Sequence, residues 1–159
     1  MAKREAAFQR TLLFALGMLV IQFLLGMVVN LFVAIPQNHP GAHPPEYFSG
    51  VVASVSWAVL HGGVWLMLHA VWGLLLVMGA AGTMLQAIRL GGGVRVALAV
   101  LGLVGVLGAG FNGGSFLNYH EDFSSMLMAV GFALALTVYL VLLYGMSARQ
   151  PDSSTAAAG

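Results

Sequence analysis

The side chains best able to bind a ligand or transfer a proton are imidazoles and carboxamides that lie within apolar stretches of the sequence. The stretch WAVLHGGVWLMLHAVWG holds His61 and His69 with three tryptophans around them. Asn30, Asn112 and His120 lie in or beside other apolar runs. Polar and ionisable groups inside a membrane are costly and usually face the interior of a helix bundle, so these residues are candidates for a functional site.

The composition defines the solvent in which these groups must act. Hydrophobic residues make up 60% of the 159-residue chain, charged residues 7%, and the mean hydropathy is +0.93. Soluble domains carry about 25% charged residues, and a chain of this length has too little interior to bury so much apolar surface. Lipid is therefore the expected partner for most of the chain. The net charge of +1 and the lack of a basic patch exclude nucleic acid as a partner.

Four apolar stretches are long enough to cross a bilayer, which takes about 20 mainly apolar residues in a helix. The first is longer than the roughly 7–15 apolar residues of a signal peptide, so we interpret it as a retained helix. We expect an all-α, four-transmembrane-helix bundle that forms a single domain over residues 1–147, with a disordered tail over 148–159. The four expected spans are about 9–34, 62–88, 94–116 and 123–147.

The segment 36–60 does not fit a membrane span. Its first part, PQNHPGAHPPEYFSG, holds four of the five prolines, which indicates an outer loop. A single helix from the end of this loop to the end of the second span would be about 60 Å long, about twice the hydrocarbon thickness. We therefore expect residues 46–60 to form a short helix at the membrane interface, with a bend near Gly62 and Gly63.

The charged residues separate into two groups on this topology. All six basic residues fall on one side of the membrane, and the outer loops on the opposite side carry acidic residues without any Lys or Arg. Because cytoplasmic segments are enriched in Lys and Arg, we expect both termini in the cytoplasm of a cell with this protein in its inner (plasma) membrane. The basic residues are Lys3, Arg4, Arg10, Arg89, Arg95 and Arg149, and the acidic residues of the outer loops are Glu46, Glu121 and Asp122.

The polar residues of the spans gather in the half of the bundle away from the cytoplasm. In the second span, Gly62, Trp65, His69, Trp72 and Gly73 recur at steps of three or four residues and are expected to share one face. The third span is rich in glycine at four-residue steps, a pattern that lets membrane helices approach closely. We expect the third span to be the packing centre, with a local distortion at its GFNGG stretch.

A four-helix membrane bundle with interior histidines resembles the integral-membrane b-type cytochromes. The likeness covers the number of helices and the histidines, and no family motif is matched. It implies a haem b in the outer half of the bundle, for electron transfer or for haem or gas sensing. His69 would be one axial ligand and His120 the other, with His61 in reserve, although His69 and His120 differ in depth by several ångströms. The other pocket residues would be Asn30 and Asn112, as donors to imidazole or propionate, and Trp65, Trp72 and Gly73, as its walls.

Three other interpretations stay open. His69, His120 and His61 are also candidate ligands for copper, together with His39 and His43 of the outer loop, because copper accepts imidazole. Alternatively, His69 is a neutral core histidine and no cofactor is bound. The third interpretation is a non-catalytic accessory subunit of a larger membrane complex, or a homo-oligomer, with the Pro-rich loop as a docking surface. An enzyme is disfavoured, because no nucleophile has a base beside it.

Overall fold

The computed structural model of the chain describes residues 2–147, which form helices and short connections. Arg149 and the expected disordered tail 148–159 lie outside the described residues. The helices are α1 (Ala2–Phe32), α2 (Tyr47–His61), α3 (Gly63–Leu90), α4 (Gly93–Tyr119) and α5 (Asp122–Ser147).

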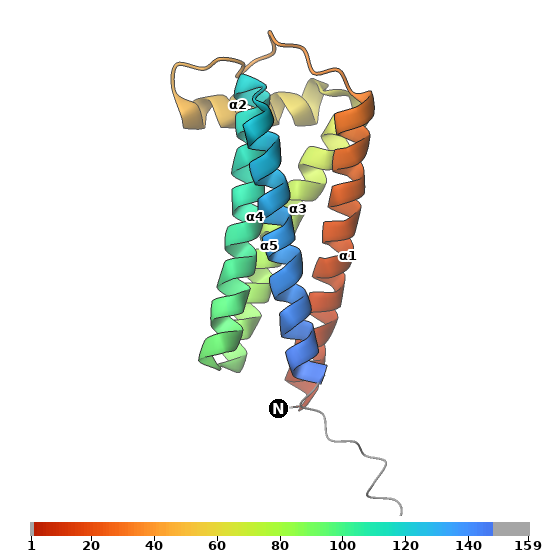
Figure 1. Cartoon of the computed structure of the whole chain (residues 1–159), viewed down its shortest axis with the longest axis vertical. Coiled ribbons are helices and arrows are strands. Elements are labelled where there is room, and N and C mark those ends of the chain that lie inside the picture. Colours follow the sequence, from red (N-terminus) through yellow and green to blue (C-terminus); the bar gives the residue numbers. More distant parts are fainter. Residues whose placement is uncertain (1, 148–159) are drawn as a thin grey trace, which may run out of the picture.

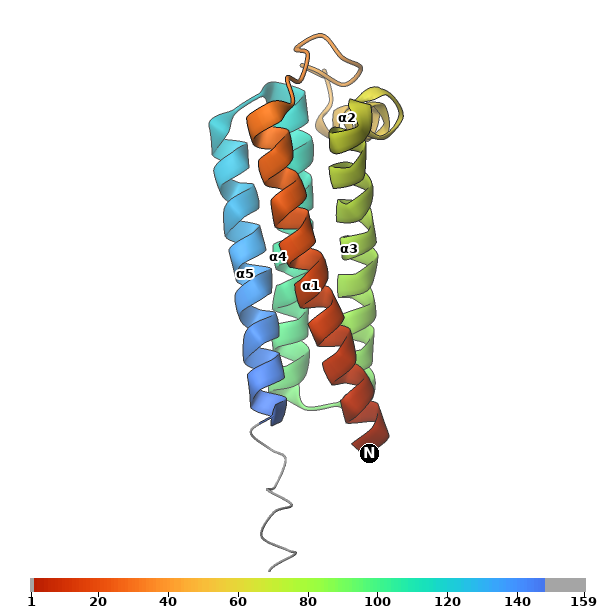
Figure 2. The same cartoon turned by 90° about the vertical axis from the view of Figure 1, so that its right-hand side faces the viewer.

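The four long helices form an antiparallel bundle, and α2 lies across one end of it (Figure 1 and Figure 2). Within the bundle, α1 packs against α3 and α5, and α4 packs against the same two helices, while α2 packs against α3 and α4. We call the end with α2, the loop 33–46 and the α4–α5 turn the cap end. The opposite end, with the start of α1 and the α3–α4 turn, is the basic end.

The four long helices match the expected spans to within a few residues at most boundaries. By length and composition, each is long and apolar enough to cross a membrane, which is consistent with a multi-pass membrane protein. The short helix expected over 46–60 is present as α2. The helix α1 begins at Ala2 and so extends beyond the expected span, which starts near residue 9. One expectation is wrong: the GFNGG stretch is regular helix within α4. Packing against neighbouring helices overrides the low helix propensity of glycine there.

Proline and glycine determine several helix ends. Pro36 lacks an N–H group and disfavours helical geometry in the residue before it, so α1 stops at Phe32. Gly63 has a φ of +76°, which makes the expected bend between α2 and α3. Gly91 and Gly92 have φ values of +75° and +91° and form the tight turn between α3 and α4. A residue with a side chain adopts such angles only with strain.

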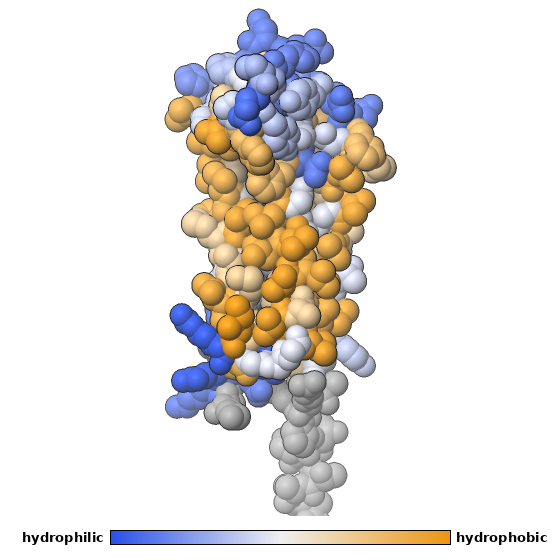
Figure 3. Space-filling view, turned by 90° about the vertical axis from the view of Figure 1, so that its left-hand side faces the viewer, coloured by the Kyte–Doolittle hydropathy of each residue, from blue (hydrophilic) through white to orange (hydrophobic). Residues whose placement is uncertain are grey.

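A broad apolar band surrounds the bundle between its two polar ends. Figure 3 shows hydrophobic side chains over the middle of one face and hydrophilic side chains above and below them. Large apolar side chains are exposed on all four long helices, for example Phe14, Met78, Val104 and Val130. Soluble monomers rarely expose such a large contiguous apolar surface, so lipid or another apolar partner has to cover the band.

Small residues let the helices of the bundle approach closely. A Cβ atom added to Gly105 would lie 2.7 Å from the Gly131 carbonyl oxygen, and one on Gly131 would lie 2.6 Å from the Gly105 carbonyl oxygen. The backbones of α4 and α5 therefore touch at this crossing. A side chain on Gly102 would collide with the buried ring of Tyr139. These contacts make α4 a packing centre, as the glycine steps predicted.

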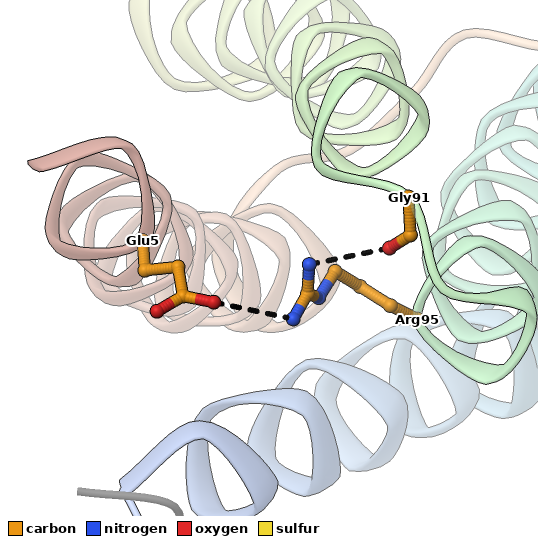
Figure 4. A network of polar contacts seen from close by, with 3 residues as sticks. All are labelled: Glu5, Gly91 and Arg95. Carbon is orange, nitrogen blue, oxygen red and sulfur yellow. Dashed lines mark hydrogen bonds and ion pairs between the residues drawn. The ribbon is translucent and has the colours of Figure 1, made fainter. Parts of the chain in front are cut away.

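A few polar contacts join the helices at the basic end (Figure 4). The Arg95 guanidinium lies 3.8 Å from the Glu5 carboxylate and donates to the Gly91 carbonyl oxygen at 3.2 Å. The Thr11 hydroxyl, in α1, hydrogen bonds to Gln86 of α3 at 3.1 Å. Ion pairs with an exposed partner contribute only about 0–1 kcal/mol, so apolar packing is the main source of stability at this end.

Candidate functional site

A polar pair links α1 and α3 within the apolar band. The amide nitrogen of Gln22 lies 3.3 Å from each ring nitrogen of His69. A neutral imidazole has one donor and one acceptor nitrogen, so Gln22 donates to the nitrogen that carries the lone pair. His69 lies about two turns into α3 and faces α1, in agreement with the interior position predicted for it.

Two glycines make room for this pair. A Cβ atom on Gly26 of α1 would lie 3.1 Å from Cε1 of His69. A Cβ atom on Gly73 of α3 would lie 3.2 Å from the amide nitrogen of Gln22. Each helix therefore supplies one polar side chain and one glycine, and each glycine accommodates the polar side chain of the other helix.

The Gln22–His69 pair lies between two apolar clusters. Leu19 and Leu76 belong to the cluster toward the basic end, and Leu66 belongs to the cluster toward the cap end. The amide oxygen of Gln22 is buried and has no hydrogen-bond partner among the described residues. A buried polar atom without a partner costs about 1–3 kcal/mol. The pair is thus a polar layer in the bundle with one acceptor left over.

A second polar network joins α4, α2 and the loop at the cap end. Asn118 and Ser54 are fully buried, and their side chains hydrogen bond at 2.7 Å. With its amide nitrogen turned toward Ser54, Asn118 also lies 3.1 Å from the Gly41 carbonyl oxygen and 3.2 Å from that of Gly50, and accepts from the Val51 N–H at 3.3 Å. The hydrogen-bond network selects this amide orientation, because it satisfies both amide atoms. One side chain therefore ties three segments together.

The cap is closely packed around this network. Gly41 has a φ of +92°, and a side chain there would collide with Ser54. A side chain on Gly50 would collide with Pro44 of the loop. A Cβ atom on Gly114 would lie 2.7 Å from a side chain of α2. The loop and α2 are consequently held against the end of α4.

A carboxylate caps the start of α2. Glu46 accepts hydrogen bonds from the backbone N–H groups of Ser49 at 2.7 Å and Phe48 at 2.9 Å. These bonds, with that of Ser49 the stronger influence, hold the pKa of the Glu46 carboxyl below its ordinary value. The negative charge also interacts favourably with the N-terminal end of the helix dipole.

Two histidines meet at the cap end. His39 is 6% exposed, and its ring stacks on Trp57 with centroids 4.3 Å apart. Its ring nitrogens lie 2.9 Å from the Pro40 carbonyl oxygen and 3.0 Å from the Leu117 carbonyl oxygen. The ring of His120 lies 6.1 Å from that of His39, centroid to centroid. Both ring nitrogens of His120 are buried and have no hydrogen-bond partner within residues 2–147.

The predicted histidines and Asn30 lie in different surroundings. His69 lies against α1, whereas His120 lies beside His39 at the cap end, so the two expected axial ligands belong to separate clusters. His61 and Asn30 are exposed to the surroundings of the bundle. The structure therefore does not gather these four residues around one point.

Of the remaining predicted site residues, Trp72 and Asn112 make hydrogen bonds, and Trp65 lies at the surface. The indole N–H of Trp72 donates to the Met18 carbonyl oxygen at 3.0 Å, and the Asn112 amide donates to a carbonyl oxygen of its own helix at 2.7 Å. Trp65 is 48% exposed, while Leu66 is buried. Trp65 lies four residues before His69 and Leu66 three residues before it, so helical spacing alone allows either residue to share the face of His69. The structure buries Leu66.

Several observations bear on a bound haem or metal. Within the described part of the chain, no group of three or more His, Asp or Glu side chains comes together as a metal site. Gln22 and Gly26 fill the space beside His69 on the side of α1, so a haem bound there would require α1 to move. Haem binding through His69 stays a prediction.

Sequence reasoning missed several residues that build these networks. A signal for the α1–α3 pair existed: Gln22 and Gly26 are four residues apart, as are His69 and Gly73, so the two pairs match when the helices are antiparallel. The cap network has no such local signal, because it depends on how the Pro-rich loop folds. The residues missed as site residues are Gln22, Ser54 and Asn118, whereas His39 was named with His120 among the candidate copper ligands.

Comparison with protein-family models, with curated proteins and with solved structures found no match to this chain. Its function has therefore to be inferred from its residues and their geometry.

Proposed function

We propose that this chain is a non-enzymatic accessory protein of a larger membrane complex, embedded by its four long helices. The observation that carries the proposal is the cap network, in which Asn118 and Ser54 fix the Pro-rich loop and α2 on the end of α4. A surface that is rigid before binding loses less conformational entropy when a partner docks. The cap lies at one end of the bundle (Figure 1), beyond the apolar band (Figure 3), where a partner subunit can reach it.

Several polar side chains of the long helices form hydrogen bonds within the bundle. The Thr83 hydroxyl donates to the Gly79 carbonyl oxygen at 2.8 Å, and Asn112 likewise bonds to its own helix. Trp72 bonds across to the backbone of α1. Such hydrogen bonds satisfy polar side chains that lipid cannot satisfy. They do not connect a nucleophile to a base and an orienting group, which nucleophilic catalysis requires. This distribution favours a structural role over catalysis.

The same proposal includes an orientation in the inner membrane. The basic end carries Lys3, Arg4 and Arg95, and the cap end carries Glu46 and Asp122. The excess of Lys and Arg in cytoplasmic segments then puts the basic end in the cytoplasm. The cap faces the other side of the membrane, where it would contact the partner subunit.

The test is purification of the chain from its native membrane in a mild detergent, followed by native mass spectrometry. We expect a stoichiometric complex with another subunit, and we expect Asn118→Leu to release that subunit. Thr11→Val removes a hydrogen bond at the basic end and serves as the matched control, which should leave the complex intact. A monomer, or a complex that survives Asn118→Leu with a disordered cap, would contradict the accessory role.

A b-type haem is the second candidate, supported by His69, an imidazole in a spanning helix whose side-chain partner is a neutral amide. An absorption spectrum of the purified protein separates the two candidates. Under the accessory proposal the protein is colourless. A reduced-minus-oxidised spectrum with Soret and α bands that disappear in His69→Ala would favour haem instead.

A further inference from the structure

The hydrogen-bond partners of His39 do not match a neutral imidazole. Both of its ring nitrogens face backbone carbonyl oxygens, that of Pro40 at 2.9 Å and that of Leu117 at 3.0 Å. A carbonyl oxygen only accepts hydrogen bonds, and a neutral imidazole has only one N–H donor. One nitrogen lone pair of a neutral His39 therefore points at an oxygen lone pair. A metal ion bound to that nitrogen removes this conflict.

The ring nitrogens of the neighbouring His120 have no hydrogen-bond partner in the part of the chain that the structure describes. It ends α4 in a left-handed conformation with a φ of +56°, a position that usually holds glycine or asparagine. Its backbone N–H bonds to the Phe116 carbonyl oxygen at 2.8 Å, yet neither ring nitrogen has a partner in the described residues. Buried polar atoms without a partner are rare in native proteins, and a bound ion is one of the explanations.

The two rings lie within the range of separations that a shared metal ion allows. Their centroids lie 6.1 Å apart, with the ring planes at 47°. Each centroid lies about 3.2 Å from an ion bound through a bond of about 2.0 Å, so the centroids of two ligating imidazoles lie about 4.5 Å apart at a right angle and about 6.4 Å apart on opposite sides of the ion. The observed 6.1 Å falls near the upper limit and requires a wide angle at the ion. We propose that His39 and His120 bind a divalent transition-metal ion at the cap end, with Cu²⁺ the tightest binder. This site is distinct from any haem site at His69 and does not depend on the accessory role.

The surroundings of the pair suit such an ion. Stacking on Trp57 orients the His39 ring, and one carbonyl contact is retained as the second bond of the ligating imidazole, which is the usual arrangement for metal-bound histidine. Backbone carbonyl oxygen and water complete the coordination. A nitrogen and oxygen ligand set without thiolate favours Cu²⁺ among the divalent first-row ions.

The charge of the cap end favours cations over anions. Glu46, Glu121 and Asp122 are exposed there, and the Lys and Arg residues of the described chain lie at the basic end. The summed field raises the local concentration of cations. Glu121 and Asp122 directly follow His120 in the chain.

The test is titration of the full-length, tag-free protein in nanodiscs, stripped of metal with a chelator, with Cu²⁺ in competition with a chromophoric chelator. We expect one Cu²⁺ per chain and electron paramagnetic resonance with nitrogen coupling from two imidazoles. His39→Ala and His120→Asn should each weaken binding at least about tenfold and reduce the coupling to one imidazole. Asparagine tolerates the left-handed conformation, so His120→Asn keeps the end of α4.

Three variants serve as matched controls, because each removes a histidine outside the pair. His43→Asn and His61→Ala remove exposed imidazoles near the cap, and His69→Ala removes the intramembrane one. His43 has a φ of +48°, a left-handed conformation that asparagine tolerates. All three should bind Cu²⁺ as the wild type does. Wild-type affinity in a folded His120→Asn variant would overturn the proposal. A loss of binding in His43→Asn or His61→Ala as large as that in His120→Asn would also overturn it, as would the lack of stoichiometric binding to the wild type.

Discussion

Replacing Asn118 by Leu should open the cap without unfolding the bundle. The variant keeps the number of heavy atoms and the branching of the side chain at a fully buried position but removes the amide. It deletes the 2.7 Å bond to Ser54 and the contacts to the carbonyl oxygens of Gly41 and Gly50 at 3.1 and 3.2 Å. A lost bond costs about 0.5–1.5 kcal/mol and each buried group left without a partner about 1–3 kcal/mol. We expect the free energy of cap opening to fall by about 2–4 kcal/mol, because the opened loop regains some bonds to water.

Hydrogen exchange of the α2 amides, measured by mass spectrometry in nanodiscs, reads this opening directly. A loss of 2–4 kcal/mol corresponds to about 30- to 1000-fold faster exchange, at 1.36 kcal/mol per tenfold. Thr11→Val removes a hydroxyl at the far end of the bundle and should leave α2 exchange unchanged. Exchange of α2 within threefold of the wild type in Asn118→Leu would refute the reasoning, as would equal acceleration in all five helices.

Three other predictions address the bundle and the start of α2. Gly105→Ala puts a methyl 2.7 Å from the Gly131 carbonyl oxygen and should destabilise the α4–α5 crossing by about 1–3 kcal/mol in detergent unfolding, whereas Gly145→Ala, with no described atom within 4 Å of the new methyl, should not destabilise. The pKa of Glu46 is lowered, so the stability that its carboxylate gives to the start of α2 is fully present above the ordinary pKa of 4.5 and is lost as the pH falls through the lowered pKa. Hydrogen exchange of the α2 amides should accelerate over that pH range, and Glu46→Gln should abolish this pH dependence. Trp72→Phe loses an indole bond to the α1 backbone and should cost about 1 kcal/mol, seen as a lower unfolding midpoint.

The architecture could be predicted because it depends on local properties of the sequence. Four long apolar runs require four long helices whatever their neighbours are, and the length of the run after the Pro-rich loop required a bend, which the structure places at Gly63. The helix α1 extends to Ala2, before the expected span, because the charged residues before the apolar run also favour helix. GFNGG was expected to distort, yet the contact of Gly114 with α2 and the packing of α4 on α5 keep it helical.

The candidate site could be predicted only in part, because its contacts join segments distant in sequence. The interior position of His69 followed from its depth in an apolar run. Its partner Gln22 is 47 residues away in the sequence, and the matching four-residue steps from Gln22 to Gly26 and from His69 to Gly73 were the signal for this pair. His120 was assigned to the same pocket as His69, but its position at the end of α4 places it beside the folded loop and His39 instead. The loop conformation depends on Asn118, a residue whose role no sequence pattern indicates.

Labelling in an intact membrane tests directly on which side of the bilayer the cap lies. The chain has no cysteine, so a single cysteine introduced at Gln37 in the exposed loop, or at Ala6 near the exposed start of α1, is a unique label site. In spheroplasts, a membrane-impermeant maleimide should label Gln37→Cys at once and Ala6→Cys only after the membrane is permeabilised. Labelling of Ala6→Cys but not Gln37→Cys before permeabilisation, or equal labelling of both, would contradict a four-span bundle with its cap outside the cytoplasm.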